Sequence, residues 1–284
     1  MLARQSLTPA EIRAAAELAE VCNAYEGLDL VLDLDVLPAP AEQTRALLYY
    51  ADDALVGFLR LYGFGRSEVE VVGMVHPAWR RRRIFRTLLE EALAEARRRG
   101  AGRLLLACEE RSASGQAFVK AVGAVYSFSE HKMVWHGGPP PAPPTALLEL
   151  RPATAADADL LVQLYVACFD DPEEEMQIHV DTILRDPERD VQLAYLDGAP
   201  IGMITLVLSE DEAYVAGFGV VPELRGRGYG RQILGMVINQ ALLSRTRIVL
   251  EVETDNLSAL GLYQSCGFRE TTAYDYYALD LPTS

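Results

Sequence analysis

Apolar and polar residues follow two periodicities along the chain, one typical of helices and one typical of β-strands, and these alternate through both halves. In the N-terminal half we predict strands at residues 46–50, 54–62, 68–75 and 104–108 and helices at 9–22, 82–99 and 114–122. In the C-terminal half we predict strands at 192–196, 200–208, 212–221 and 248–253 and helices at 155–168, 173–184 and 229–243. Strands followed by crossover helices predict an α/β fold with a mixed, partly parallel sheet in each half.

A segment rich in proline and glycine separates the two halves. Residues 137–144 read Gly-Gly-Pro-Pro-Pro-Ala-Pro-Pro, which cannot continue a helix or join the interior of a sheet and which favours an extended spacer. A chain of 284 residues is long enough for two domains that each bury a core. We therefore predict domains at residues 1–136 and 146–284, joined by a linker at 137–145.

Acidic residues are concentrated in the C-terminal half. The formal net charge of the chain is −15, and residues 146–284 carry 9 Lys and Arg against 23 Asp and Glu. A negatively charged domain repels nucleic acid and anionic membranes and attracts cations, so a cationic amine is favoured over an anionic ligand. For most of these residues, solubility alone is the simpler explanation.

Other features bear on compartment and metal content. No apolar run approaches the ~20 residues that cross a bilayer, and no secretory signal pattern is visible, so we expect a soluble cytoplasmic protein. The cysteines are widely separated, which predicts free and mostly buried thiols at Cys22, Cys108, Cys168 and Cys266. The four histidines lack the spacing of metal ligands, so no metal is expected.

Residues 220–230 join a predicted strand to a predicted helix through a turn that reads Val-Val-Pro-Glu-Leu-Arg-Gly-Arg-Gly-Tyr-Gly. Its glycines and arginines are Gly226, Gly228 and Gly230, and Arg225, Arg227 and Arg231. Bare glycine backbone at a helix N-terminus lets several N–H groups converge on an anion, and the arginines add positive charge. The common nucleotide-hydrolase and dinucleotide motifs do not fit. We predict a phosphate-binding loop; the alternative is a surface turn with incidental arginines.

A second segment, residues 250–268, predicts a strand, a helix that starts at Asn256 and carries Tyr263, and a helix stop at Gly267. Its Asn-x-x-Ala-x-x-Leu-Tyr-x-x-x-Gly-Phe pattern and the Arg-x-x-Gly-x-Gly loop resemble the two hallmark segments of the GNAT acyltransferase superfamily. They occur in the same order, separated by one helix and one strand. The C-terminal half is therefore identified as similar to this superfamily. Its Leu-Glu-Val run at residues 250–252, followed by the Asn-x-x-Ala-x-x-Leu-Tyr pattern, resembles the ribosomal-protein and protein N-terminal acetyltransferases.

The resemblance implies tandem acyl-CoA N-acyltransferase domains that use acetyl-CoA as co-substrate and an amine as acceptor. By this resemblance, the residues that would hold acetyl-CoA are Phe218, Val220, Val221, Arg225, Gly226, Arg227, Gly228, Tyr229, Gly230, Arg231, Asn256 and Tyr263. Asn256 could cap its helix, contact the pantetheine arm, or do both. Gly217 and Gly219 inside a strand predict a bulge or a close backbone approach.

Two side chains are candidates for the proton transfers of acyl transfer. Glu251 and Glu253 alternate with apolar Leu250 and Val252, which places both carboxylates on one face of the strand. The resemblance makes Glu251 the base that deprotonates the amine and Tyr263 the acid that protonates the thiolate, because phenol and thiol pKa values lie within about two units. The alternatives are a solvated strand carboxylate and a core aromatic residue.

The N-terminal half repeats these segments at a period of about 145 residues, but its copy is degenerate. The replacements, relative to the C-terminal copy, are Arg83 for Gly228, Phe85 for Gly230, Ala107 for Glu251, Ser112 for Asn256 and Val119 for Tyr263. With the carboxylate, the amide and the phenol lost, we predict a domain without catalytic activity, whose backbone cradle is partly filled. Its arginines could still hold a ligand similar to coenzyme A.

We therefore predict an enzyme whose C-terminal domain transfers acetyl, or another small acyl group, from acetyl-CoA directly to a primary amine of a small molecule or a protein. The tandem arrangement resembles that of the mycothiol synthases, in which the second half is active, although no specific residue match extends this likeness. The alternative is an acyl-CoA-binding or regulatory module in which neither half catalyses. The acidic run at residues 170–175 could select a cationic acceptor, although acidic residues are also ordinary at a helix start.

Overall fold

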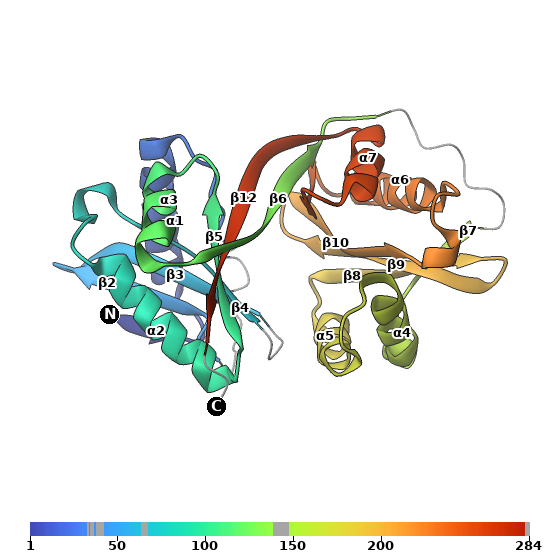
Figure 1. Ribbon diagram of the computed structural model, residues 1–284. Coiled ribbons are helices and arrows are strands. Elements are labelled where there is room, and N and C mark those ends of the chain that lie inside the picture. Colours follow the sequence, from blue (N-terminus) through green and yellow to red (C-terminus); the bar gives the residue numbers. More distant parts are fainter. Residues whose placement is uncertain (33, 35–36, 38–42, 64–67, 139–147, 282–284) are drawn as a thin grey trace. The chain divides into compact units, whose positions relative to one another are not determined.

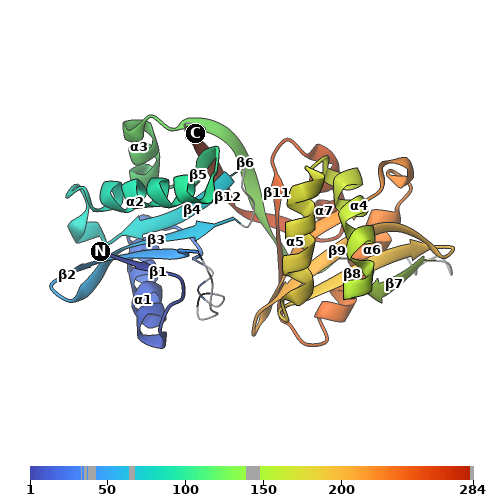
Figure 2. The same cartoon turned by 90° about the horizontal axis from the view of Figure 1, so that it is seen from below.

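The computed structural model describes residues 1–281 with gaps at 33, 35–36, 38–42, 64–67 and 139–147. The chain forms two compact units (Figures 1 and 2). Unit 1 comprises Met1–Ser129 with Thr272–Ser284, and unit 2 comprises Glu130–Thr271. Each unit has the predicted α/β character. The predicted linker at 137–145 lies outside the described residues from 139 onward.

Unit 1 is a mixed sheet with helices on both faces. Its elements are β1 (Leu2–Arg4), α1 (Pro9–Glu26), β2 (Ala46–Ala51), β3 (Ala54–Tyr62), β4 (Glu68–Val75), α2 (Ile84–Arg99), β5 (Arg103–Glu109), α3 (Ala113–Val122), the first part of β6 (Val125–Trp135) and the second part of β12 (Phe268–Asp280). Strands β4 and β5 are parallel, whereas the β1–β2, β2–β3, β3–β4 and β5–β12 pairs are antiparallel. The predicted elements are all present, with ends that differ by a few residues.

The helices of unit 1 cover opposite faces of the sheet, with α1 on one side and α2 and α3 on the other (Figure 2). Leu59, Leu88 and Leu104 are fully buried in the core under α2, and Phe58 is fully buried in the core under α1. Helix α1 begins with a capping box in which the Thr8 hydroxyl accepts from the Glu11 N–H and the Glu11 carboxylate accepts from Thr8 N–H.

Unit 2 repeats this plan. Its elements are the second part of β6, β7 (Leu148–Pro152), α4 (Ala158–Phe169), α5 (Glu173–Arg185), β8 (Arg189–Leu196), β9 (Ala199–Leu208), β10 (Glu212–Val220), α6 (Tyr229–Ala241), β11 (Arg247–Glu253), α7 (Leu257–Ser265) and the first part of β12 (Phe268–Asp280). Helices α6 and α7 lie on one face of the sheet, and α4 and α5 lie on the other (Figure 1). The predicted helix at 155–168 consists of a 3₁₀ turn at Ala155–Asp157 followed by α4.

Strands β6 and β12 each begin in one unit and end in the other. In β6, residues from Glu130 belong to unit 2, where Val134 pairs with Val249 of β11. In β12, residues from Thr272 belong to unit 1, where Tyr274 pairs with Glu109 and Asp280 with Arg103 of β5. The compact units therefore differ from the sequence halves 1–136 and 146–284, which follow the chain without this exchange.

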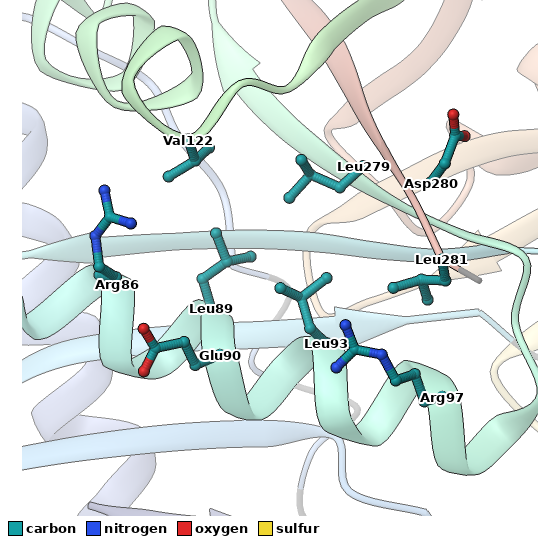
Figure 3. Close-up of a pocket in the computed structure, with 9 residues that line it drawn as sticks. All are labelled: Arg86, Leu89, Glu90, Leu93, Arg97, Val122, Leu279, Asp280 and Leu281. Carbon is teal, nitrogen blue, oxygen red and sulfur yellow. The ribbon is translucent and has the colours of Figure 1, made fainter.

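The exchanged part of β12 also packs on α2. Leu279 and Leu281 lie across a shallow hollow of about 210 Å³ from Leu89 and Leu93 of α2 (Figure 3). Leu281 is 5% exposed and belongs to the main core of unit 1. Leu279 and Leu281 are thus structural parts of unit 1.

Candidate active site

The predicted phosphate-binding loop follows β10 as a short 3₁₀ turn, Pro222–Leu224, and leads into α6. Gly226 and Gly228 have φ angles of +73° and +83°, in the left-handed region that favours glycine. A Cβ atom added at either position would meet no atom within 4 Å, so the space in front of this backbone is open. No side chain caps the first turn of α6, whose N–H groups are therefore available to an anion.

Two of the three loop arginines donate hydrogen bonds that hold the loop in place. Arg225 donates from Nε to the Val220 carbonyl oxygen at 2.8 Å and from Nη2 to the Cys168 carbonyl oxygen at 2.9 Å. Arg231 donates to Ser265 Oγ at 2.9 Å. Arg227 makes no hydrogen bond or ion pair within the described chain and is the arginine best placed to meet a ligand. Arg225 and Arg231 therefore hold the loop in place, whereas Arg227 has no partner among the described residues.

Strands β10 and β11 part at their C-terminal ends. They pair in parallel only from Glu212–Arg247 to Val215–Leu250, although both strands continue beyond these pairs. A bulge lies between Ala216 and Gly219, as the two strand glycines predicted. The backbone of β10 beyond the bulge is therefore not paired with β11, and it can take a ligand's amide groups instead.

The apolar residues predicted to line this region lie on the α6 and α7 side of β10. Partly buried Phe218, Val220, Val221 and Tyr229 pack against the core that contains Tyr263. Gly230 is in close contact, because a Cβ there would come within 3.3 Å of Leu262 and 3.7 Å of Phe218. This glycine allows α6, α7 and β10 to approach one another.

Tyr263 projects from α7 beside β10. The side chain of Asn256 begins this helix by accepting from the Ala259 N–H at 3.1 Å, so its capping role is present. Tyr263 is 8% exposed, and its ring centroid lies 6.5 Å from that of Phe218 and 6.0 Å from that of Phe268.

The buried position changes the acidity of the phenol. Burial, with a smaller contribution from Cys266, raises the pKa of Tyr263 to about 12. The pKa difference between this phenol and a thiol is therefore larger than the ordinary pKa values of the two groups suggest. The hydroxyl stays protonated throughout the neutral range, which is the state that a general acid requires.

Glu251 lies on the opposite face of β11 from Tyr263. Leu250 and Val252 are buried in the same core as Tyr263, so alternation along the strand turns Glu251 toward the face covered by α4 and α5. The Tyr214 hydroxyl donates to Glu251 Oε2 at 3.0 Å. Sequence reasoning missed Tyr214, because only the pairing of β10 with β11 brings it near Glu251.

The counterpart region of unit 1 contains a cavity of about 510 Å³. Strands β4 and β5 part beyond Val71 and Leu106, as β10 and β11 do in unit 2. The cavity is lined by the ends of these strands, the loop before α2 and one side of α3, including Arg80, Arg81, Arg83, Phe85, Cys108 and Ser112.

The loop of unit 1 keeps the backbone conformation of the glycine loop without its glycines. Arg81 and Arg83 both have φ +64°, close to the values at Gly226 and Gly228. Arg80 donates to the Val75 carbonyl oxygen at 3.1 Å, as Arg225 does in unit 2, and it forms an ion pair with Glu26 at 2.9 Å. The backbone cradle is therefore preserved, and arginine side chains are added to it.

The side chains predicted to be catalytic, Glu251 and Tyr263, are replaced by Ala107 and Val119 in unit 1. Val119 of α3 is 4% exposed and is buried in the core of this unit. Ser112 caps α3 by accepting from the Gly115 N–H at 3.1 Å, which is the capping role of Asn256 in α7. Burial, then the charges of Asp275, Glu109 and Glu26, raises the pKa of Cys108 to about 12, which disfavours the thiolate form at neutral pH.

The acidic run at residues 170–175 spans the turn between α4 and α5. Asp170 ends α4 with φ +61°, and the three glutamates Glu173–Glu175 form the first turn of α5. Partial burial, then Glu175 and Asp170, raises the pKa of Asp171. The glutamates complement the dipole of α5 in this position.

No group of three or more His, Cys, Asp or Glu side chains in the described part of the chain is arranged to hold a metal ion. None of the described helices combines the length and apolar character that a membrane span requires.

The loop, the parted strands and the helix that carries Tyr263 form the arrangement expected of an acyl-CoA-dependent acetyltransferase. The chain matches the model of the acetyltransferase (GNAT) family twice, at residues 13–124 and 158–268. It therefore belongs to the GNAT acetyltransferase family, with two tandem domains, and is an N-acetyltransferase. Enzymes of this family use acetyl-CoA and an acceptor substrate.

Similar proteins share the whole length of the chain. The mycothiol acetyltransferase of Clavibacter michiganensis subsp. michiganensis is 29% identical over 286 residues, which cover 95% of this chain and 92% of that protein. The mycothiol acetyltransferase of Mycobacterium ulcerans is 27% identical over 319 residues, which cover 98% of this chain and 97% of that protein.

Solved structures share the fold. A GCN5-related N-acetyltransferase from Sphaerobacter thermophilus matches with a TM-score of 0.77 and 19% identity, over 100% of this chain and 98% of that one. A tandem GNAT protein from the clavulanic acid biosynthesis pathway matches with a TM-score of 0.68 and 18% identity, over 98% of both chains.

Proposed function

We propose that unit 2 transfers the acetyl group of acetyl-CoA directly to a primary amine, with Glu251 as base and Tyr263 as acid. The amine nitrogen attacks the thioester carbonyl carbon, the carbon–sulfur bond breaks, and an amide and coenzyme A are formed. Glu251 accepts the proton that the amine loses, and the Tyr263 hydroxyl donates a proton to the departing thiolate. The observation that carries this proposal is the open glycine cradle at the start of α6 together with buried Tyr263 on α7.

The cradle supports binding of the diphosphate of acetyl-CoA. Gly226 and Gly228 expose backbone N–H groups in front of α6, and Arg227 is free to add positive charge. The unpaired edge of β10 beyond the bulge supports binding of the pantetheine amides, and Phe218 and Val220 support its apolar part. We assign no direct ligand contact to Arg225 or Arg231, because their guanidinium groups already bind the protein.

The opposite placement of Glu251 and Tyr263 suits direct transfer. The thioester would lie where β10 and β11 part, so that an amine approaches from the α4 and α5 side and the thiolate leaves toward α7. Proton removal and proton delivery then occur on different sides of the thioester carbon. Because of this separation, the base Glu251 does not take its proton from the acid Tyr263.

We further propose that unit 1 holds an acyl-CoA without catalysing transfer. The support is the cavity of about 510 Å³ beside a loop that keeps the left-handed backbone at Arg81 and Arg83. Each such arginine costs on the order of 1 kcal/mol, a strain that is found where a binding site fixes the backbone. Val119 in place of a tyrosine leaves this unit without a proton donor for the thiolate.

The acceptor is the least constrained part of the reaction. The name of the relatives makes mycothiol chemistry the first class to test. The acidic residues of the C-terminal half, including the run between α4 and α5, support a cationic amine such as a polyamine or aminoglycoside. A protein N-terminus or lysine is the third class, favoured by the Leu-Glu-Val segment at residues 250–252.

Calorimetry with acetyl-CoA on the intact chain tests the binding sites before an acceptor is known. We expect two sites, one of which is lost in Gly228→Val and the other in the double variant Arg81→Asp, Arg83→Asp. One site, lost only in Gly228→Val, would restrict binding to unit 2. If the folded protein gives no heat of binding when acetyl-CoA is added, the proposal is contradicted for both units.

An acceptor panel, read out as thiol release from acetyl-CoA, tests catalysis. We expect Tyr263→Phe and Glu251→Gln each to lower kcat by roughly 10²–10⁴-fold while acetyl-CoA still binds. Tyr195→Phe and Glu212→Gln remove a tyrosine hydroxyl and a carboxylate elsewhere in unit 2 and serve as controls. Acetyl-CoA binding without turnover of any amine would favour the alternative, a binding module.

A further inference from the structure

A lysine from the first half of the sequence lies within the sheet of unit 2. Lys132 is on the exchanged part of β6, where it pairs directly with Glu251 of β11 in the antiparallel register. Directly opposed residues on such strands have Cβ atoms about 4.5–5.5 Å apart and side chains on the same face. The side chain of Lys132 is therefore a neighbour of the proposed base.

The side chain of Lys132 is mostly buried. It is 8% exposed, and its side chain makes no hydrogen bond or ion pair within the described chain. The hydrogen bond that involves this residue goes from the Thr271 hydroxyl to the Lys132 carbonyl oxygen. With no ion-pair partner among the described residues, the charge of Lys132 acts on the groups beside it on the sheet, so these groups decide what it does.

The surroundings of Lys132 are acidic. Glu130 and Glu253 are directly paired on the same two strands, and the period of two places them on the face that carries Lys132 and Glu251. Partial burial, then Asp255 of the following turn, raises the pKa of Glu253. Three carboxylates thus share one face with a single lysine.

Other titratable groups among the described residues face Glu251 or cover this side of the sheet. Tyr214 of β10 donates its hydroxyl to Glu251 at 3.0 Å. Helices α4 and α5 pack on β8, β9 and β10, where Tyr165 and His179 contact each other with ring centroids 5.0 Å apart. Burial, then Arg189, lowers the pKa of His179, which favours its neutral form. Among the described residues, Lys132 is the cation that lies directly opposite Glu251 in the strand register.

We propose that Lys132 is a positioning residue for the acetyl transfer, which keeps the Glu251 carboxylate ionised against the like charges of Glu130 and Glu253. This inference rests on the proposed role of Glu251 as base. A base must be deprotonated before the amine arrives, and neighbouring carboxylates work against that state. The exchanged strand β6 therefore supplies unit 2 with a charge that its own half of the sequence lacks at this site.

The test is a pH titration of Glu251 in the full-length protein labelled with ¹³C at the glutamate carboxyl carbons. The resonance that disappears in Glu251→Gln identifies the group. We expect Lys132→Met to raise its midpoint by about one pH unit, because an opposite charge at ~6 Å lowers a carboxyl pKa by roughly that amount. Lys132→Arg, which keeps the charge, should restore the midpoint to within a few tenths of a unit.

An unchanged midpoint in folded Lys132→Met would overturn the proposal, and so would an equal shift in Lys132→Arg, because that result would show an effect of shape and not of charge. Thermal melting and acetyl-CoA binding check the fold, and Lys132→Gln replaces the methionine variant if that variant does not fold. Once an acceptor is known, the acidic limb of kcat/KM should move upward with the midpoint. If Glu251→Gln turns over at the normal rate, the proposed base itself is wrong.

Discussion

The exchange of β12 predicts that unit 1 depends on the last residues of the chain. A protein ended after Thr271 would lose the strand that pairs with β5 over seven register positions, Tyr274–Glu109 to Asp280–Arg103. It would also lose three side chains that are at least 94% buried, namely Tyr274, Tyr276 and Leu281. At about 1.5–3 kcal/mol for each large apolar side chain, the loss is about 5–9 kcal/mol before the strand hydrogen bonds are counted.

This loss is comparable to the whole stability of an ordinary domain, about 5–15 kcal/mol. We therefore expect unit 1 to be unfolded in the truncated protein at 25 °C. Hydrogen exchange followed by mass spectrometry would show this as complete loss of protection in β5, residues 103–109. A protein ended after Leu281 keeps the strand and serves as the matched control.

Point variants separate packing from chain length. Tyr276 stacks on Phe128, with ring centroids 4.4 Å apart and planes at 14°, and its replacement by alanine should cost about 3–5 kcal/mol in the free energy of unfolding. Asp280→Ala, at an exposed position of the same strand, should change it by less than about 0.5 kcal/mol. If the truncated protein keeps native protection in β5, the structural role assigned to β12 is refuted. The same reasoning predicts that residues 1–136 expressed alone do not form a stable unit.

Two further predictions concern the cradle and the response to pH. Gly228→Val places a β-branched residue at φ +83°, and we expect about 1–2 kcal/mol of destabilisation in urea unfolding together with at least a tenfold weaker site for acetyl-CoA by calorimetry; unaltered affinity would contradict the cradle. Burial raises the pKa of the Glu95 carboxyl, but hydrogen bonds from Arg98 and Arg99 outweigh it and hold the pKa below its usual value. Because the folded pKa is depressed, the stabilisation is present above about pH 4.3 and is lost as pH falls through the folded pKa. Glu95→Gln should therefore cost about 1–3 kcal/mol at pH 7 and progressively less below pH 4, as measured by urea unfolding across pH; a cost independent of pH would show that the charge is irrelevant.

The sequence by itself determined the local structure and the family. Glycines at 226 and 228, Asn256 as a helix cap and Gly267 as a helix end are local signals, because their backbone and capping requirements involve only neighbouring residues. The bulge in β10 followed from glycine in a strand for the same reason. The repeat of these signals at about 145 residues was enough to predict two tandem domains, and the family model matches both halves.

The tertiary structure decided everything that depends on which strands pair. The carbonyl partners of Arg225, the hydroxyl of Tyr214 on Glu251 and the position of Lys132 opposite Glu251 all join segments between 5 and 119 residues apart in the chain, and the strand pattern is the same whatever the pairing. The exchange of β6 and β12 is invisible in the sequence, because an alternating strand can pair with either of two sheets. The left-handed backbone at Arg81 and Arg83 could not be predicted from the sequence either, since arginine adopts this conformation only where the surrounding fold compensates the strain.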